Sequence, residues 1–179
     1  MGWFSPVKGS YPSLAQVDKA LPVKDGVTSI KRGTIVVLKP DDTGKSAEGV
    51  WDVASGTDTI LYVALQDYTD PTAGFAGTSF DPEGGTPKIN ALDLNQDAEY
   101  ETSVFDTTKS YTVGQPLYVG TGGVLTNVDP GSGTVVGYVT APKTDRWINN
   151  AIAVPKNGTD QRLAIRTGAT QSVLRFKTK

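Results

Sequence analysis

Three short motifs in this sequence carry residue types that could do chemistry, and the first resembles the end of a phosphate-binding loop. Residues 44–46 read Gly-Lys-Ser, and in such a loop backbone amides and the lysine hold phosphate oxygens. The motif needs a glycine five residues before Gly44, where this chain has Lys39. Asp41 and Asp42 would also repel phosphate. We therefore interpret the segment as a surface turn.

The second motif has the alternating oxygen ligands that begin a calcium-binding loop. Asp93, Asn95 and Asp97 occupy alternate positions, as in the first half of an EF-hand. The sixth position of that loop should be glycine and is Ala98, and the twelfth should be glutamate and is Val104. The sequence therefore predicts a polar turn between strands and no bound metal.

The third candidate is a pair of carboxylates, of the kind that glycosidases use as acid and base. Asp67 with Asp70, or Glu99 with Glu101, have suitable residue types, but the flanking sequence indicates neither an enclosing cleft nor a raised pKa. The chain has no His and no Cys, which excludes Ser–His–Asp and Cys–His hydrolases, HExxH metalloproteases and thiolate metal sites. We predict a protein that is not an enzyme and that needs no cofactor.

The elements that would position any site are predicted to be strands. The 179 residues include 20 Gly and 11 Pro, and these turn-forming residues alternate with runs rich in Thr and Val. No apolar run reaches the length of a membrane span, and the first residues lack the form of a secretory signal. The sequence predicts a soluble protein made in the cytoplasm, with no membrane partner.

Nine to eleven short strands are expected, at spacings near ten residues. A hairpin turning at Gly122-Gly123 is predicted, because paired glycines adopt the positive φ angles of a tight turn. The fold class is all-β, a small β-barrel or a β-tulip or sandwich, with extended N- and C-terminal arms and at most one short helix. The expected strands lie within residues 34–38, 49–54, 60–65, 88–94, 100–105, 111–120, 124–126, 134–140, 148–154, 162–167 and 172–177.

The predicted domain organisation has three parts. Residues 1–26 are an extended N-terminal arm, in which residues 13–21 could form the one short helix. Residues 27–167 are the β-domain, with a long loop at residues 67–87. Residues 168–179 are a basic C-terminal tail. Both ends are predicted to be ordered by a partner.

Charge is segregated along the chain although the net charge is only −2. Residues 1–40 carry six basic and two acidic groups, residues 41–106 carry two basic and fourteen acidic groups, and residues 107–179 carry nine basic and three acidic groups. The basic ends could lie against the acidic middle of the same chain, or a basic surface could dock on a protein partner. An acidic protein with a pI near 5.1 is not predicted to bind nucleic acid.

Several glycine-anchored phrases resemble the head decoration, or cement, proteins of tailed bacteriophages. They are residues 31–38 (KRGTIVVL), 62–67 (YVALQD), 111–119 (YTVGQPLYV), 122–126 (GGVLT) and 135–139 (VVGYV). The resemblance implies a small β-domain with extended termini that binds the outer surface of a mature icosahedral head. It also implies contacts with the major capsid protein and with neighbouring copies, as a trimer or else a dimer, and no catalytic residues. The acidic segment 67–106 departs from the simplest such proteins and could reach a neighbouring subunit.

Partner contact is predicted for an aromatic and basic set of residues. The aromatic residues are expected to anchor in pockets between capsid subunits, and the basic residues to face acidic capsid surface. A tail-fibre or carbohydrate-binding module of a phage particle remains the alternative; it would use Trp3, Trp51 and Trp147 as a stacking platform, although Trp51 is expected in the core. The predicted contact residues are Trp3, Phe4, Tyr11, Lys8, Lys19, Lys24, Lys31, Arg32, Arg162, Arg166 and Arg175.

Overall fold

The fold is described from a computed structural model. It describes residues 2–7, 20–70, 88–94, 97–131, 133–153 and 164–179, and gives only the backbone for residues 147–153 and 164–169. The expected helix at residues 13–21 and most of the expected loop at residues 67–87 lie outside the described residues. So do the predicted contact residues Lys8, Tyr11, Lys19 and Arg162.

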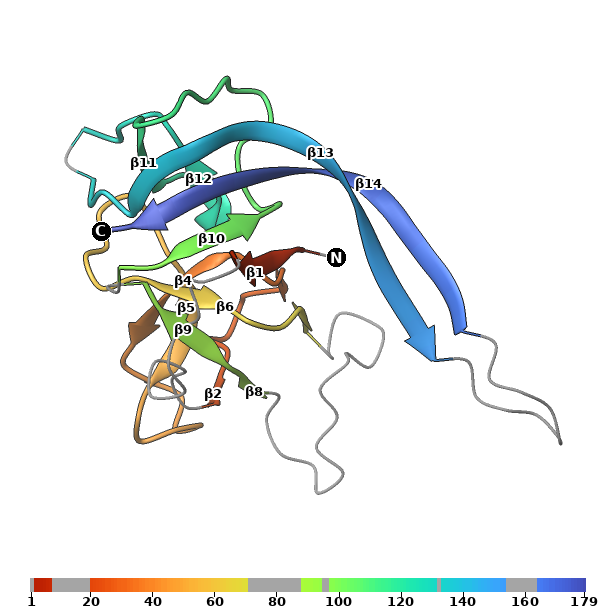
Figure 1. Ribbon diagram of the computed structural model, residues 1–179. Coiled ribbons are helices and arrows are strands. Elements are labelled where there is room, and N and C mark those ends of the chain that lie inside the picture. The colour runs from red at the N-terminus through yellow and green to blue at the C-terminus, as the bar shows by residue number, and fades with distance from the viewer. Residues whose placement is uncertain (1, 8–19, 71–87, 95–96, 132, 154–163) are drawn as a thin grey trace, which may run out of the picture.

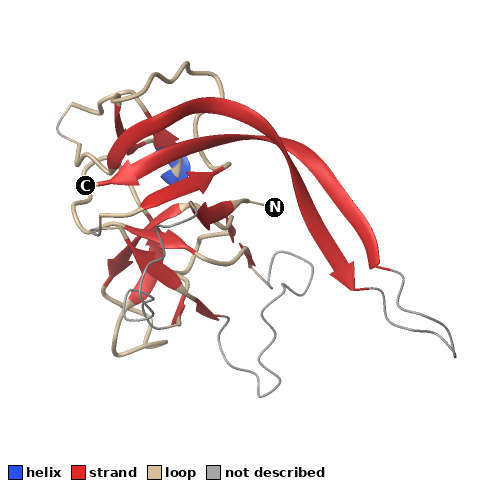
Figure 2. Ribbon diagram, in the orientation of Figure 1, coloured by secondary structure: helices blue, strands red, loops and turns tan. Residues whose placement is uncertain are grey.

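The all-β prediction is confirmed, with 46% of residues in strands. The one helical element among the described residues is a 3-10 turn at Thr121–Gly123. The strands form several antiparallel sheets and no closed barrel (Figure 2). Of the architectures considered from the sequence, the closed barrel is therefore wrong, because β1 and β12 remain edge strands of an open sheet.

The larger sheet has six strands in the order β1-β10-β14-β13-β11-β12 (Figure 1). All its neighbouring strands are antiparallel. Strands from both ends of the chain therefore meet in one sheet. They are β1 (Phe4–Pro6), β10 (Glu99–Thr102), β14 (Ala164–Thr178), β13 (Gly137–Ala153), β11 (Pro116–Val119) and β12 (Leu125–Thr126).

The second sheet has four strands in the order β5-β4-β6-β9, and two short strand pairs, β2-β8 and β3-β7, complete the body. The apolar run predicted at residues 34–38 forms the inner strand β4. The strands are β4 (Ile35–Lys39), β5 (Val50–Val53), β6 (Tyr62–Ala64), β9 (Ala91–Asp93), β2 (Leu21–Pro22), β8 (Lys88–Ile89), β3 (Ser29–Ile30) and β7 (Tyr68–Thr69).

Two apolar clusters form the core. The larger contains side chains from both sheets, among them Phe4, Val63, Tyr100 and Phe176, and Phe4 stacks on Tyr100 with ring centroids 4.8 Å apart. The smaller surrounds Trp51, which is fully buried and donates its indole N–H to the Ile89 carbonyl at 3.1 Å. Burying each such large side chain stabilises the fold by about 1.5–3 kcal/mol. The prediction of Trp51 in the core is confirmed.

The predicted glycine hairpin is also confirmed. β11 and β12 pair across the turn, and Gly122 and Gly123 have φ angles of 75° and 69°. A Cβ on Gly123 would lie 2.5 Å from the Ile35 carbonyl oxygen. Gly123 is therefore required twice, by its φ angle and by close packing of the turn on β4.

Both chain ends differ from the sequence interpretation where the structure describes them. Phe4 of the expected N-terminal arm is a core residue in β1, and Leu21 and Val23 belong to the smaller apolar cluster. Residues 168–179 are not a tail, because β14 is an inner strand of the six-stranded sheet with Leu174 and Phe176 fully buried. The basic residues of this strand alternate with apolar residues that face the core. The prediction of a basic tail took account only of the basic set.

Two pairs of predicted strands prove to be two long strands. The segments 134–140 and 148–154 lie largely in β13, which has 17 residues, and 162–167 and 172–177 lie largely in β14, which has 15. β13 and β14 pair along most of their length, from Gly137↔Thr178 to Ala153↔Ala164. Figure 1 shows them arching over the body and then running beyond it.

Candidate functional site

The part of β13 and β14 that leaves the body is here called the ribbon. It comprises Thr144–Ala153 paired with Ala164–Val173. β14 pairs with β10 only from Leu174 to Lys177, and β13 pairs with β11 only at Gly137 and Tyr138. Within the described chain, each ribbon strand therefore has the other as its only strand neighbour. At about 3.3 Å per residue the ribbon extends roughly 30 Å.

The ribbon leaves the sheet at two irregularities in β13. The strand register shifts between Val139 and Ala141 and again between Ala141 and Thr144, each time with one extra residue on β13. Such bulges bend a strand and increase its twist. They directly precede Thr144, where the ribbon begins, so they influence the direction in which the ribbon emerges.

A buried carboxylate joins both ribbon strands to the body at this bend. Glu101 on β10 is 7% exposed. Its Oε1 accepts hydrogen bonds from Arg175 Nη2 at 2.7 Å and Nε at 3.1 Å, and its Oε2 accepts one from Arg146 Nη1 at 2.7 Å. Arg175 lies on β14 and Arg146 on β13, so one side chain holds both strands. We call Glu101, Arg146 and Arg175 the root triad.

Neighbouring polar contacts reinforce the same bend. Lys143 Nζ donates to the Thr107 carbonyl at 2.8 Å, and Thr140 Oγ1 donates to Glu99 Oε1 at 2.5 Å. These contacts connect β13 to the segment that follows β10 and to β10 itself. The root of the ribbon is therefore fixed to the body.

A hollow of about 600 Å³ lies beside the ribbon root. It is bordered by the start of the chain, by the segment after β10 and by Gln171 and Ser172 of β14. The side-chain oxygen of Gln171 is buried and has no hydrogen-bond partner in the described residues. No described donor reaches this oxygen. Leaving a buried acceptor unpaired lowers the stability of the fold by about 1–3 kcal/mol.

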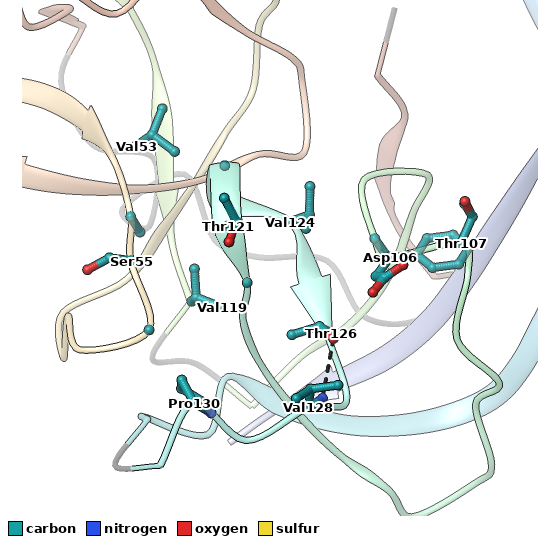
Figure 3. Close-up of a pocket in the computed structure, with 15 residues that line it drawn as sticks. Val53, Ser55, Asp106, Thr107, Val119, Thr121, Val124, Thr126, Val128 and Pro130 are labelled. Atoms are coloured by element: carbon teal, nitrogen blue, oxygen red, sulfur yellow. Dashed lines mark hydrogen bonds between the residues drawn. The ribbon is translucent and has the colours of Figure 1, made fainter.

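A second hollow, of about 940 Å³, lies at the β11–β12 hairpin (Figure 3). Val53 and Ser55 stand on one side of it and Asp106 on the other, with Val119 and Val124 between them. Hydrogen bonds from the hydroxyl and backbone N–H of Thr108 lower the pKa of Asp106. The walls are mainly small apolar side chains, which fit an apolar contact and lack the grouped acid–base residues of a catalytic cleft.

The predicted aromatic anchors take different positions. Phe4 is buried in this chain's own core, so the prediction that it docks in a capsid pocket is wrong. Trp3 is half-buried, and the Arg32 guanidinium lies 5.8 Å from its ring centroid. Of the three tryptophans weighed as a sugar platform, Trp51 is fully buried, and the Trp147 side chain lies outside the described part.

The predicted basic contacts are also dispersed. Lys24 forms an ion pair with Asp52 at 2.9 Å, and that hydrogen bond raises the pKa of Lys24. Lys31 lies beside the 600 Å³ hollow, and the backbone N–H of Arg32 donates to Asp67 Oδ1 at 2.8 Å. Arg166 lies in the ribbon, where the backbone alone is described, and Arg175 belongs to the root triad.

In the sequence Glu101 was considered only as half of a carboxylate pair, and Arg146 and Gln171 were not singled out. Glu101 is separated from Arg146 by 45 residues and from Arg175 by 74. No local sequence pattern predicts these contacts, because only the pairing of β10, β14 and β13 brings Glu101, Arg146 and Arg175 together. The one available signal was a glutamate within an apolar strand pattern, which requires a cationic partner if it is buried.

The segment that resembles a phosphate-binding loop lies on the surface of the body. Residues 41–46 form a turn in which Asp41 accepts hydrogen bonds from the backbone of Thr43 and Ser46, and Lys45 pairs with Asp25. The surface-turn interpretation is therefore confirmed. No group of three or more His, Cys, Asp or Glu side chains suited to a metal ion occurs among the described residues.

Comparisons with known proteins give no relative. No family model matches the chain, and searches of curated proteins and of solved structures found no significant match. In the part of the chain that the structure describes, no helix is long and apolar enough to cross a membrane.

Proposed function

We propose that this protein is a capsid decoration, or cement, protein that binds the outer surface of a mature phage head and stabilises contacts between major capsid subunits. The resemblance to such proteins, which spans roughly residues 27–140, motivates the proposal. The observation that carries it is the ribbon, which extends beyond the body and, among the described residues, has no strand neighbour there except its own partner strand.

An isolated two-stranded ribbon is marginally stable in water. Ribbon residues gain stability when a second surface covers them, and a capsid offers a repeated surface on which such an arm can lie across a subunit boundary. Each arm then adds contacts that only the expanded shell presents, and it stabilises that shell by linkage. Seating many copies on one lattice makes modest affinity per copy sufficient.

The anchoring role moves from the N-terminal aromatics to the ribbon. Phe4 contributes to the core, so its removal would unfold the protein before it weakened a docking contact. The ribbon instead combines a body-fixed root with a long outer part, and its described root carries charge through Lys143, Asp145 and Arg146. Exposed charges of this kind steer docking more than they strengthen it.

The test compares full-length protein with a ribbon-shortened variant on expanded heads of its phage, by pelleting. Residues 147–170 are replaced by Asn-Gly, which joins Arg146 to Gln171, its register partner, through a two-residue hairpin turn. This design keeps the root triad and the whole body. Circular dichroism and urea unfolding of the variant serve as the control for folding.

We expect full-length protein to bind expanded heads and not unexpanded ones, and the shortened variant to lose most of its occupancy. Failure of the full-length protein to bind expanded heads would contradict the proposed function itself. If the two proteins occupied expanded heads equally, the decoration function would stand, but the ribbon would not be the part that contacts the capsid.

A further inference from the structure

The ribbon has two long edges, and they differ in how they are protected against another strand. The β13 edge carries Pro142, two bulges and the exposed charged residues Lys143 and Asp145 where the ribbon leaves the body, whereas from Trp147 to Ala153 it has no proline, bulge or charged residue. Proline, bulges and charges are the features by which edge strands avoid pairing. The edge of β14 from Ala164 to Ser172 has no proline, no bulge and one charged residue, Arg166.

Among the residues that the structure describes, no strand covers this β14 edge, because β10 ends early. β10 covers β14 from Leu174 to Lys177. Beyond Thr102 the chain leaves β14, because the Val104 N–H donates to the Thr102 hydroxyl and the Val104 carbonyl accepts from the Leu125 N–H. From Ala164 to Ser172, the backbone polar groups of alternate residues of β14 therefore face outward on that side. Such a row is a template for a further strand.

The hydrogen bonds between β14 and β10 show which residues of β14 direct their backbone N–H and C=O groups toward this edge. The backbone N–H of Thr178 donates to the Ala98 carbonyl on the β10 side at 2.9 Å. Backbone groups alternate between the two sides of a strand, and the extra residues at both bulges lie on β13, so β14 keeps its alternation. Even-numbered residues therefore present N–H and C=O to the open edge, namely Ala164, Arg166, Gly168, Thr170 and Ser172.

We propose that this edge binds the same edge of a second copy, antiparallel about a two-fold axis at Gly168. In that register, Ser172 faces Ala164 of the second copy, Thr170 faces Arg166 of the second copy, and Gly168 faces its equivalent. Every facing pair is a hydrogen-bonding pair, so about ten backbone hydrogen bonds form. The two ribbons become one four-stranded sheet, which overcomes the marginal stability of each alone.

The side-chain content of the edge fits self-pairing. Arg166 is the only charged residue from Ala164 to Ser172, and in this register it faces Thr170 of the second copy. No like charges are opposed, which would weaken a sheet. A two-fold interface of one surface with itself is also the commonest arrangement in protein oligomers.

The inference is independent of the proposed function, because it is tested on the isolated full-length protein. The chain has no cysteine, so a single introduced cysteine reports one position. Gly168→Cys places two thiols on facing residues about 5.5 Å apart between Cα atoms, within disulfide range. Asn149→Cys is the matched control: Asn149 is the register partner of Gly168 on β13, and its two copies would lie about 14 Å apart.

A proline at position 170 tests the hydrogen bonds themselves. Thr170→Pro removes an N–H from the open edge, whereas the N–H groups that bind β13 belong to odd-numbered residues and remain. Two equivalent hydrogen bonds are lost per dimer, so we expect the dimer dissociation constant to rise about 30-fold. Thr170→Ala keeps the N–H and serves as the control.

We expect light scattering to give a dimer for wild type and Thr170→Ala, and a shift to monomer for Thr170→Pro. Oxidation should cross-link Gly168→Cys and leave Asn149→Cys uncross-linked. A wild-type monomer at every soluble concentration would overturn the proposal. Cross-linking of Asn149→Cys in place of Gly168→Cys, or association unaffected by the proline, would overturn it equally.

Discussion

Glu101 on β10 accepts two hydrogen bonds from the guanidinium of Arg175 on β14, at 2.7 and 3.1 Å, while it is 7% exposed. The second oxygen of the same carboxylate accepts a hydrogen bond from Arg146 on β13. A buried carboxylate is tolerated only when its charge is compensated in this way. The two arginines are themselves part-exposed, so water shares in their solvation.

Glu101→Gln is expected to destabilise the fold by about 1–3 kcal/mol, because it removes the charge that two arginines bind and leaves part of their hydrogen-bonding unsatisfied. Urea unfolding measures this change. Asp97→Asn is the control: it breaks an ion pair between the residues just before β10 and Lys177 of β14. Both of these side chains are mostly exposed, and such pairs contribute about 0–1 kcal/mol. Equal losses in the two variants would contradict the special role of burial at Glu101.

Two adjacent glycines at the β11–β12 turn are expected to differ sharply. Both have positive φ, but a Cβ on Gly122 meets nothing within 4 Å, whereas one on Gly123 meets the Ile35 carbonyl at 2.5 Å. Gly122→Ala should cost about 1–2 kcal/mol from backbone strain alone. Gly123→Ala should cost more, because the turn must also move away from β4. Thermal unfolding of both variants checks the order, and similar melting temperatures would show that the close contact is relieved without cost.

Tyr111 is expected to make stability fall at high pH. Burial raises the pKa of its hydroxyl to about 12, and that hydroxyl donates to the Asp106 carbonyl at 2.8 Å. The unfolded chain ionises this tyrosine near pH 10. Its contribution is therefore complete below pH 10 and lost as pH rises from 10 to 12.

Urea unfolding at pH 8 to 11 should show a steeper decline for wild type than for Tyr111→Phe. Tyr138→Phe, at an exposed tyrosine, should behave like wild type. A decline of the same steepness in Tyr111→Phe and wild type would mean that other groups cause the alkaline loss.

Phe176 is expected to be essential although only three residues follow it in the sequence. It is fully buried and packs against Tyr100 with ring centroids 6.0 Å apart. Phe176→Ala should therefore cost about 3–5 kcal/mol, as for other large core truncations. Val113→Ala, at a residue 66% exposed, should stay within about 0.5 kcal/mol. Guanidinium unfolding of both variants gives the comparison, and a small effect at Phe176 would restore the idea of a detachable tail.

The sequence alone determined the fold class and much of its local structure. Runs of β-branched residues predicted β4 and β5, and Gly122-Gly123 predicted the hairpin turn, because strand propensity and positive φ are properties of neighbouring residues. The failed spacing at Gly44 and Lys45 likewise identified a surface turn. Each of these conclusions needed only a few consecutive positions.

Only the tertiary structure decided which segments became core and which became the ribbon. Phe4 and Phe176 lie near opposite ends of the chain and still pack on the same residue, Tyr100. Glu101 meets Arg146 and Arg175 through strand pairing alone. Such contacts depend on sheet order and register, which local periodicity does not encode, so residues that resembled terminal arms in the sequence lie in sheet strands and contribute side chains to the core.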